Sequence, residues 1–200
     1  MKKLAILVSG RGSNFEAIAR QIRDGKLEAE IAAVVANMPT AKALETAETL
    51  GLPAISLPSK GIDTDTYAAM VVEKLAPLGI DLIILAGFMR RVGTPLLEAY
   101  RDRILNIHPS LLPSFPGLHV QQLALDYGVK FSGCTVHFVD AGLDTGPIVA
   151  QAIVPVLDGD TADTLAARIL VEEHRIFSEA IALILSGAYR VEGRRVIRKD

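Results

Sequence analysis

The sequence has few of the residues that mark secreted or membrane proteins. It contains a single cysteine and no tryptophan, and aromatic residues make up 5% of its 200 residues. Cys134 cannot form an internal disulfide and lies in a strand-like run, so we expect a buried thiol and a reducing compartment. No apolar run approaches the ~18 residues that span a bilayer. The apolar run in "MKKLAILVSG" is too short for a signal peptide. We expect a cytoplasmic protein.

An excess of charge of either sign is also absent. The formal net charge is −2, and 50% of the residues are apolar. This balance argues against disorder and gives no overall attraction to nucleic acid. A chain of this length can bury the core of one domain.

The first half alternates strand and helix patterns. Apolar runs predict strands at residues 3–9, 31–37, 53–57 and 81–88. Helical spacing and stop signals predict helices from Ser13 to about Gly25, at residues 41–51 and at residues 63–78. Such alternation is typical of parallel strands with helices on both faces.

The second half has a different pattern. We expect strands at residues 104–108, 132–139 and 147–156, helices at 121–128 and 161–186, and a hairpin at 189–197 that turns at Glu192 and Gly193. No linker divides the chain. The sequence therefore predicts a single-domain, Rossmann-like α/β fold over residues 1–200, with a parallel N-terminal half and mixed or antiparallel C-terminal strands.

The glycine-rich stretch "VSGRGSN", residues 8–14, joins the first strand to the first helix. Small residues and a helix N-terminus favour an anion, and the pattern fits a single phosphate better than a dinucleotide. A second interpretation needs no ligand, because Ser13 and Glu16 have the spacing of a capping box.

Candidate catalytic residues follow the strand "ILNIH". Asn106 and His108 are two residues apart, so both can face one side, and Pro109 keeps His108 extended. An asparagine amide can stabilise an oxyanion and a histidine can supply a proton or charge. Asp144, in the loop "GLDTGP", can orient a histidine or move a proton. Taken singly, residues of these types are more often ordinary loop or capping polars than catalytic groups.

Metal binding is the competing use of the histidines. His108, His119, His137 and His174 lack the spacing of known zinc motifs, so we expect no metal. His137 lies in an alternating strand, and we interpret it as a semi-buried residue with satisfied hydrogen bonds.

Five blocks resemble a known family. "SGRGSN", "LAGFMR", "ILNIHPSLLPSFPGLH", "GCTVHFV" and "LDTGPIVAQ", in this order, resemble the phosphoribosylglycinamide formyltransferases within the folate-dependent formyltransferase family. The resemblance runs from residue 3 to about residue 186. From the length, we expect neither the extra C-terminal domain of the tRNA enzymes nor the extra N-terminal domain of the hydrolases.

The resemblance implies a reaction. The formyl group of 10-formyltetrahydrofolate passes to the amine of glycinamide ribonucleotide in purine biosynthesis, by direct attack through a tetrahedral intermediate. Asn106 and protonated His108 would stabilise the oxyanion, and Asp144 would hold the histidine charge and help move the proton. The partners would be these small molecules, with no nucleic acid and no membrane, and the protein would be a monomer or homodimer.

The resemblance also implies binding residues. Gly12, Ser13 and Asn14 would hold the substrate phosphate, and Glu173 the ribose hydroxyls. Residues from about 1 to 100 would form the phosphate-binding half, and residues from about 101 to 200 the catalytic and folate-binding half. The folate contacts would be Leu85, Met89, Arg90, Val92, Leu97, Asn106, Asp140, Ala141, Gly142 and Asp144.

Three details complete these expectations. Gln121 replaces a histidine that is usual in the family, and Asp65 stands near a usual arginine that helps to hold the folate tail. The Leu112–Pro113 bond is expected to be cis, as in family members. Two rival functions remain: a nucleotide-binding regulatory module without chemistry, and formyl transfer to another amine, such as that of a sugar nucleotide.

Overall fold

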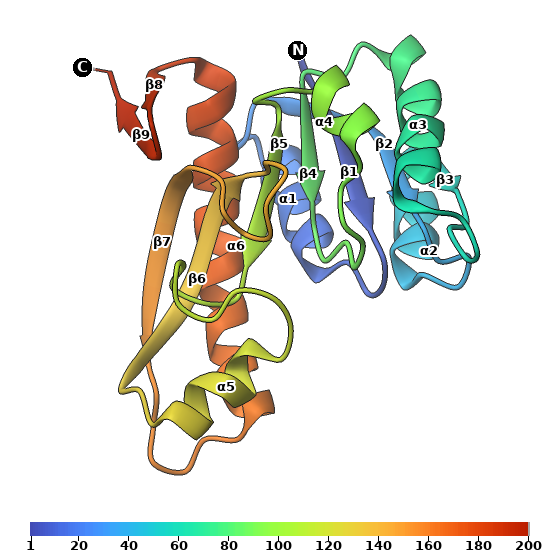
Figure 1. The fold of residues 1–200 in the computed structure, drawn as a ribbon. Helices are drawn as coiled ribbons and strands as arrows, with labels where there is room; N and C mark the ends of the chain where they lie inside the picture. The colour runs from blue at the N-terminus through green and yellow to red at the C-terminus, as the bar shows by residue number, and fades with distance from the viewer. Residues whose placement is uncertain (200) are drawn as a thin grey trace. The chain divides into compact units, whose positions relative to one another are not determined.

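The computed structural model describes residues 1–199. The chain divides into two compact units, residues 1–106 and residues 107 onward (Figure 1). The boundary falls within the strand of residues 104–108. The assignment of the two halves to phosphate and folate binding stays a prediction.

The first unit is a parallel sheet with helical crossovers. Its strands follow the order β3-β2-β1-β4-β5, and every neighbouring pair is parallel. The elements are β1 (Lys2–Val8), α1 (Ser13–Arg23), β2 (Ala29–Ala36), α2 (Lys42–Thr49), β3 (Ala54–Ser56), α3 (Thr64–Leu75), η1 (Ala76–Leu78), β4 (Leu82–Leu85), α4 (Thr94–Ala99) and β5 (Ile104–His108).

The core of this unit explains its strands. The apolar runs of β1 and β4 are almost fully buried, as expected for parallel strands that are covered on both faces. Helix α1 buries Phe15 and Ile18 on one side. Parallel strands end at one edge of the sheet, where ligands bind in such folds. The segments after β1 and β4 meet there, because the Ser9 N–H donates to the Gly87 carbonyl at 3.0 Å.

The second unit is built on antiparallel strands and one long helix (Figure 1). Strands β6 and β7 are antiparallel, β8 and β9 form a hairpin, and β7 meets β9 at Ile148 and Arg195. Helix α6 packs on β6 and β7, and the Thr161 side chain caps its first turn. The elements are α5 (Val120–Tyr127), β6 (Phe131–Phe138), β7 (Ile148–Pro155), α6 (Ala162–Ser186), β8 (Tyr189–Glu192) and β9 (Arg195–Arg198).

The predicted alternation, the parallel first half and the mixed second half are confirmed. The short helix α4 was not predicted. The predicted helix at residues 63–78 changes to a 3-10 turn at Ala76, beside Pro77, which has no N–H to continue the helical bonds. Within residues 1–199, no helix combines the length and apolar character needed to cross a membrane.

Candidate active site

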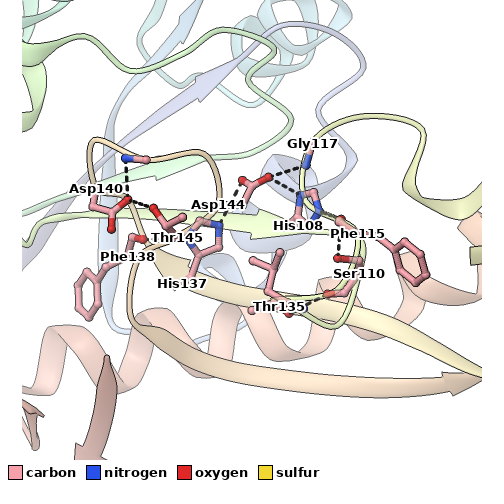
Figure 2. Close-up of polar contacts among 12 residues, drawn as sticks. His108, Ser110, Phe115, Gly117, Thr135, His137, Phe138, Asp140, Asp144 and Thr145 are labelled. Carbon is pink, nitrogen blue, oxygen red and sulfur yellow. Dashed lines mark hydrogen bonds and ion pairs between the residues drawn. The ribbon is translucent and has the colours of Figure 1, made fainter. Parts of the chain in front are cut away.

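Asp144 lies at the centre of a polar cluster in the second unit (Figure 2). Its side chain, in the loop between β6 and β7, is 12% exposed, and its Oδ2 lies 3.5 Å from Nδ1 of His108. The same oxygen accepts the Gly117 N–H at 2.9 Å. The other oxygen, Oδ1, lies 3.7 Å from Nε2 of His137. One carboxylate therefore faces two imidazole rings.

The backbone of Asp144 is itself unusual. Its φ is 53°, in the left-handed region. Non-glycine residues there carry backbone strain, which aspartate tolerates better than most. This conformation points the carboxylate toward the histidines and the Gly117 N–H. Strain of this kind is a common feature of functional loops.

His108 ends β5 and is 5% exposed. Its Nε2 lies 2.9 Å from the Phe115 carbonyl oxygen, which can only accept, so Nε2 carries the proton and donates. Its Nδ1 faces the Asp144 carboxylate. Both ring nitrogens therefore face oxygen acceptors, to which a charged imidazolium can donate from both sides. Direct donation to a substrate oxygen requires that one of these contacts be exchanged.

His137 is more than a satisfied strand residue. It is 2% exposed, and its Nδ1 donates to the Phe138 carbonyl at 2.8 Å. Burial, the largest cause, lowers its pKa, while the nearby Asp144 charge opposes that shift. We predicted that His137 is a semi-buried strand residue, but the sequence did not indicate that it contacts Asp144. The signal available in the sequence was alternation, because Thr135 and His137 share one side of β6.

Hydrogen bonds from the Thr135 and Ser110 hydroxyl groups hold the backbone of the proline-rich loop in one conformation. The Leu112–Pro113 bond is cis, as predicted. The Thr135 hydroxyl donates to the Ser110 carbonyl at 2.7 Å and accepts the Leu112 N–H at 3.0 Å. The Ser110 hydroxyl in turn lies within hydrogen-bonding distance of two carbonyl oxygens of the loop, 2.7 Å from that of Ser114 and 3.0 Å from that of Phe115. These bonds hold the segment that presents the Phe115 oxygen to His108 and the Gly117 N–H to Asp144.

Asp140 shapes the loop that carries Asp144. Its Oδ1 accepts the Gly142 N–H at 3.0 Å and the Thr145 hydroxyl at 2.6 Å. A side chain at Gly142 would collide with Thr145. The predicted folate contacts at residues 140–142 therefore lie in a turn with a defined shape, next to the proposed catalytic carboxylate.

The glycine-rich stretch forms a pocket in the first unit. Its volume is about 250 Å³, and residues 9–14 line it together with Ala86, Gly87 and Met89. Gly12, Ser13 and Asn14 thus share one pocket at the N-terminus of α1, where backbone N–H groups favour an anion.

The predicted capping box of Ser13 and Glu16 is wrong. Helix α1 begins at Ser13, its N-cap is Gly12 with φ 80°, and no side chain caps it. The Glu16 N–H donates to the Gly12 carbonyl at 2.9 Å. Only a residue that tolerates a left-handed backbone fits here, and a Cβ on Gly12 would lie 2.7 Å from the Ala43 Cβ. Packing against α2 therefore contributes to the need for glycine at this position.

The predicted folate residues of the first unit lie between the end of β4 and α4. Met89 is exposed, and Val92 and Leu97 are half-buried, so apolar surface is available. Arg90 is engaged: it donates to the Ser59 and Ile62 carbonyls at 3.0 and 2.9 Å. Its guanidinium also lies 4.8 Å from the centre of the Tyr67 ring. Because the Arg90 side chain is occupied by these contacts within the protein, only the Arg90 backbone is available to a ligand.

Asp65 and Glu173 both have specific surroundings in the structure and are not simply exposed charges. Asp65, which the resemblance places near a usual arginine, accepts the Thr94 N–H at 2.9 Å and so holds the start of α4. Glu173, which could have been an exposed helix charge, is 7% exposed on α6. The predicted burial of Cys134 is confirmed, and burial, with a contribution from the Glu173 charge, raises the pKa of its thiol to about 12.

Comparison with known proteins agrees with the motifs. The formyl transferase family matches residues 2–181. The crystal structure of glycinamide ribonucleotide transformylase 1 from Symbiobacterium toebii has 48% identity and a TM-score of 0.97, covering 100% of this chain and 95% of that one. Phosphoribosylglycinamide formyltransferase from Bacillus subtilis is 41% identical over 92% of this chain and 95% of its own length.

A third relative is much longer. The trifunctional purine biosynthetic protein adenosine-3 of Drosophila pseudoobscura is 45% identical over 94% of this chain, but the chain spans 14% of that protein's length. The predicted fold class and enzyme family are confirmed by the relatives that match over nearly their whole length. The matched family covers most of the sequence, including every predicted site residue, and the chain belongs to the formyl transferase family.

Proposed function

We propose that this chain transfers the formyl group of 10-formyltetrahydrofolate to the amine of glycinamide ribonucleotide in purine biosynthesis. The products are the N-formyl ribonucleotide and tetrahydrofolate. The observation that carries the proposal is the Asp144 carboxylate beside His108, in a chain of the formyl transferase family. Relatives of similar length from Bacillus subtilis and Escherichia coli are named for this activity.

The first step is attack by the substrate amine on the formyl carbon, which places negative charge on the formyl oxygen. Asn106 and His108 lie two residues apart on β5, so their side chains leave the same side of the strand. The Asn106 amide donates a hydrogen bond to the developing oxyanion, and protonated His108 stabilises its charge. Removing one such donor typically costs ~3–4 kcal/mol of transition-state stabilisation.

The second step moves a proton. The attacking amine becomes acidic as its bond to the formyl carbon forms, and the folate nitrogen must gain a proton as its bond to that carbon breaks. Asp144 holds the positive charge on His108 and passes the amine proton to the leaving nitrogen, directly or through water. The loop bonds from Phe115 and Gly117 keep His108 and Asp144 aligned for this transfer. The formyl group is never bonded to the enzyme in this mechanism.

The phosphate of the ribonucleotide is assigned to the pocket of Gly12, Ser13 and Asn14. The pocket of about 250 Å³ has room for a phosphate group. The buried Glu173 carboxylate is assigned to the ribose hydroxyls, for which a carboxylate is a natural acceptor.

The folate is assigned to apolar side chains and backbone groups. Met89, Val92 and Leu97 offer apolar surface to a flat ring. The Leu85 side chain, at the end of β4, is 4% exposed, so its contribution is assigned to its backbone. Arg90 contributes its backbone, since its side chain is bound to Ser59 and Ile62. The turn of Asp140, Ala141 and Gly142 offers backbone donors and acceptors next to Asp144. A cytoplasmic location and a monomer or homodimer remain part of the proposal.

The test is an assay for tetrahydrofolate with a set of amine acceptors. We expect rapid turnover with glycinamide ribonucleotide, poor turnover with the same compound lacking its phosphate, and none with an amino sugar nucleotide. Inorganic phosphate should compete with the ribonucleotide and not with the folate. Turnover with the sugar nucleotide alone would move the function to another acceptor. Binding of nucleotides without turnover of any amine would favour a regulatory module.

A further inference from the structure

A buried amide joins strand ends in the first unit. Asn37 directly follows β2 and is 5% exposed. Its Oδ1 accepts the Ser9 hydroxyl at 2.6 Å, and its Nδ2 donates to the Ser59 hydroxyl at 3.1 Å. Ser9 directly follows β1, and Ser59 follows β3 by three residues. Asn37 therefore holds the ends of both neighbouring strands through the two ends of one side chain.

The hydrogen bonds continue from Ser9 to the segment after β4. The Ser9 hydroxyl accepts the Met89 N–H at 2.7 Å. It can do so because its own proton points to Asn37, which leaves its lone pairs for Met89. The Ser9 N–H also donates to the Gly87 carbonyl at 3.0 Å. Asn37 thus sets the orientation of a hydroxyl on which the Met89 amide depends.

The other end of the amide reaches Arg90. Ser59, which accepts from Asn37 through its hydroxyl, accepts the Arg90 guanidinium through its carbonyl at 3.0 Å. The Ser59 N–H donates back to the Asn37 carbonyl at 3.1 Å. Buried chains of this type polarise one another and specify a single geometry when every member is satisfied.

This network supports both walls of the phosphate pocket. Ser9 begins the wall formed by residues 9–14, and Met89 belongs to the wall that faces it. Asn37 does not line the pocket, so its influence on a ligand passes through Ser9. Met89 and Arg90 also belong to the segment assigned to folate, so the same amide supports residues proposed for both substrates.

We propose that Asn37 is a positioning residue that sets the spacing between the phosphate turn and the Met89–Arg90 segment by orienting the Ser9 hydroxyl. The kinetic part of this inference rests on the proposed function, and the structural part does not. Removal of the amide frees the Ser9 hydroxyl to rotate, which weakens the hydrogen bond that it accepts from the Met89 N–H. The catalytic groups on β5 and beyond remain unchanged, so the loss falls on binding.

The kinetic test compares Asn37→Ala and Ser9→Ala with a matched control. Val34→Ala removes buried apolar groups from β2, the strand that Asn37 follows, without touching the network. We expect each network variant to raise the KM for the ribonucleotide by about 10-fold with a nearly unchanged kcat, since a loss of uniform binding changes KM alone. The double variant should resemble the single ones, because both act through one link. Ser9→Thr, which keeps the hydroxyl, should restore the KM.

A second readout does not depend on activity. Met89 is 67% exposed, yet its amide is bonded to Ser9, so its hydrogen exchange should be slow in the wild-type protein. Asn37→Ala should accelerate exchange at Met89 far more than Val34→Ala at equal global stability. Unchanged Met89 exchange in Asn37→Ala, or equal KM changes in Val34→Ala, would overturn the positioning role. A wild-type protein that binds phosphate and shows this exchange pattern, but does not turn over the ribonucleotide, would overturn only the proposed function.

Discussion

Asp144 Oδ2 lies 3.5 Å from His108 Nδ1, with both side chains almost excluded from solvent. The separation exceeds that of a short charged hydrogen bond, typically ~2.7–2.9 Å. The carboxylate is held instead by the Gly117 N–H at 2.9 Å, and the imidazole by the Phe115 carbonyl at 2.9 Å. The pair is therefore placed by the backbone of one loop and keeps room for a small movement when substrate binds.

The neutral state of His137 should make stability depend on pH. Its pKa is held below its ordinary value of 6.5, chiefly by burial. As the pH falls below that ordinary value the unfolded chain binds a proton that the folded chain resists. The stabilisation is therefore complete above pH 6.5 and is lost as the pH falls toward the lowered folded pKa.

The variant His137→Gln removes this titration and keeps an amide that can donate to the Phe138 carbonyl. The free energy of unfolding, measured by urea titration between about pH 7 and pH 5, should change less steeply with pH, by at most ~1.4 kcal/mol per pH unit. His119→Gln, at an exposed position in the same unit, is the control and should keep the wild-type slope. Equal slopes for wild type and His137→Gln would refute the buried, neutral histidine.

Gly12 should be required partly by its packing against Ala43. Gly12→Ala combines a left-handed backbone with the short contact between the two Cβ atoms, so it should cost about 2 kcal/mol of stability. In the double variant with Ala43→Gly that contact is gone. The sum of the stability losses in the two single variants should therefore exceed the stability loss in the double variant by about 1 kcal/mol. Strictly additive losses in urea unfolding would show that the contact carries no energy.

Asp160 should stabilise the start of α6 in a pH-dependent way. It accepts bonds from Arg168 and from the Leu157 N–H, and the Arg168 bond is the main cause that holds its pKa below the ordinary 3.8. For a lowered carboxyl pKa the stabilisation is present above the ordinary value and is lost as the pH falls through the folded value.

Asp160→Asn should accordingly lower the melting temperature near pH 7, and the difference from wild type should shrink as the pH falls below 3.8. Asp158→Asn, two residues away at a fully exposed side chain, should have almost no effect at either pH. A melting-temperature difference that stayed constant across this range would contradict the ion pair with Arg168.

Local patterns predicted the elements that are long or strongly periodic. The buried strands and α6 follow from apolar spacing. The helix α4, with six residues, is too short to show a helical period, and only its Gly93 and Pro95 mark its start. The capping box failed because the φ of 80° at Gly12 makes glycine the N-cap, which moves Ser13 into the helix.

Site residues on one loop or strand were also within reach of the sequence. The pairing of Asn106 with His108 follows from alternation along β5. The position of His137 beside Asp144 did not follow, because it depends on where the loop after β6 returns. The network around Asn37 could not be predicted, since it joins residues that follow separate strands and meet only when the parallel sheet forms.

The most direct test of the proposed chemistry is the kcat of Asp144→Asn with glycinamide ribonucleotide and 10-formyltetrahydrofolate. The amide keeps the shape of the side chain but loses the charge beside His108, so kcat should fall by about 100-fold or more with a smaller change in both KM values. The kcat of His108→Ala should fall by a similar factor. The factor by which kcat falls in the double variant should be much smaller than the product of the two single factors. Asp126→Asn, on the exposed side of α5, should keep the wild-type rate. A near wild-type kcat in folded Asp144→Asn would contradict the assignment of this carboxylate to formyl transfer.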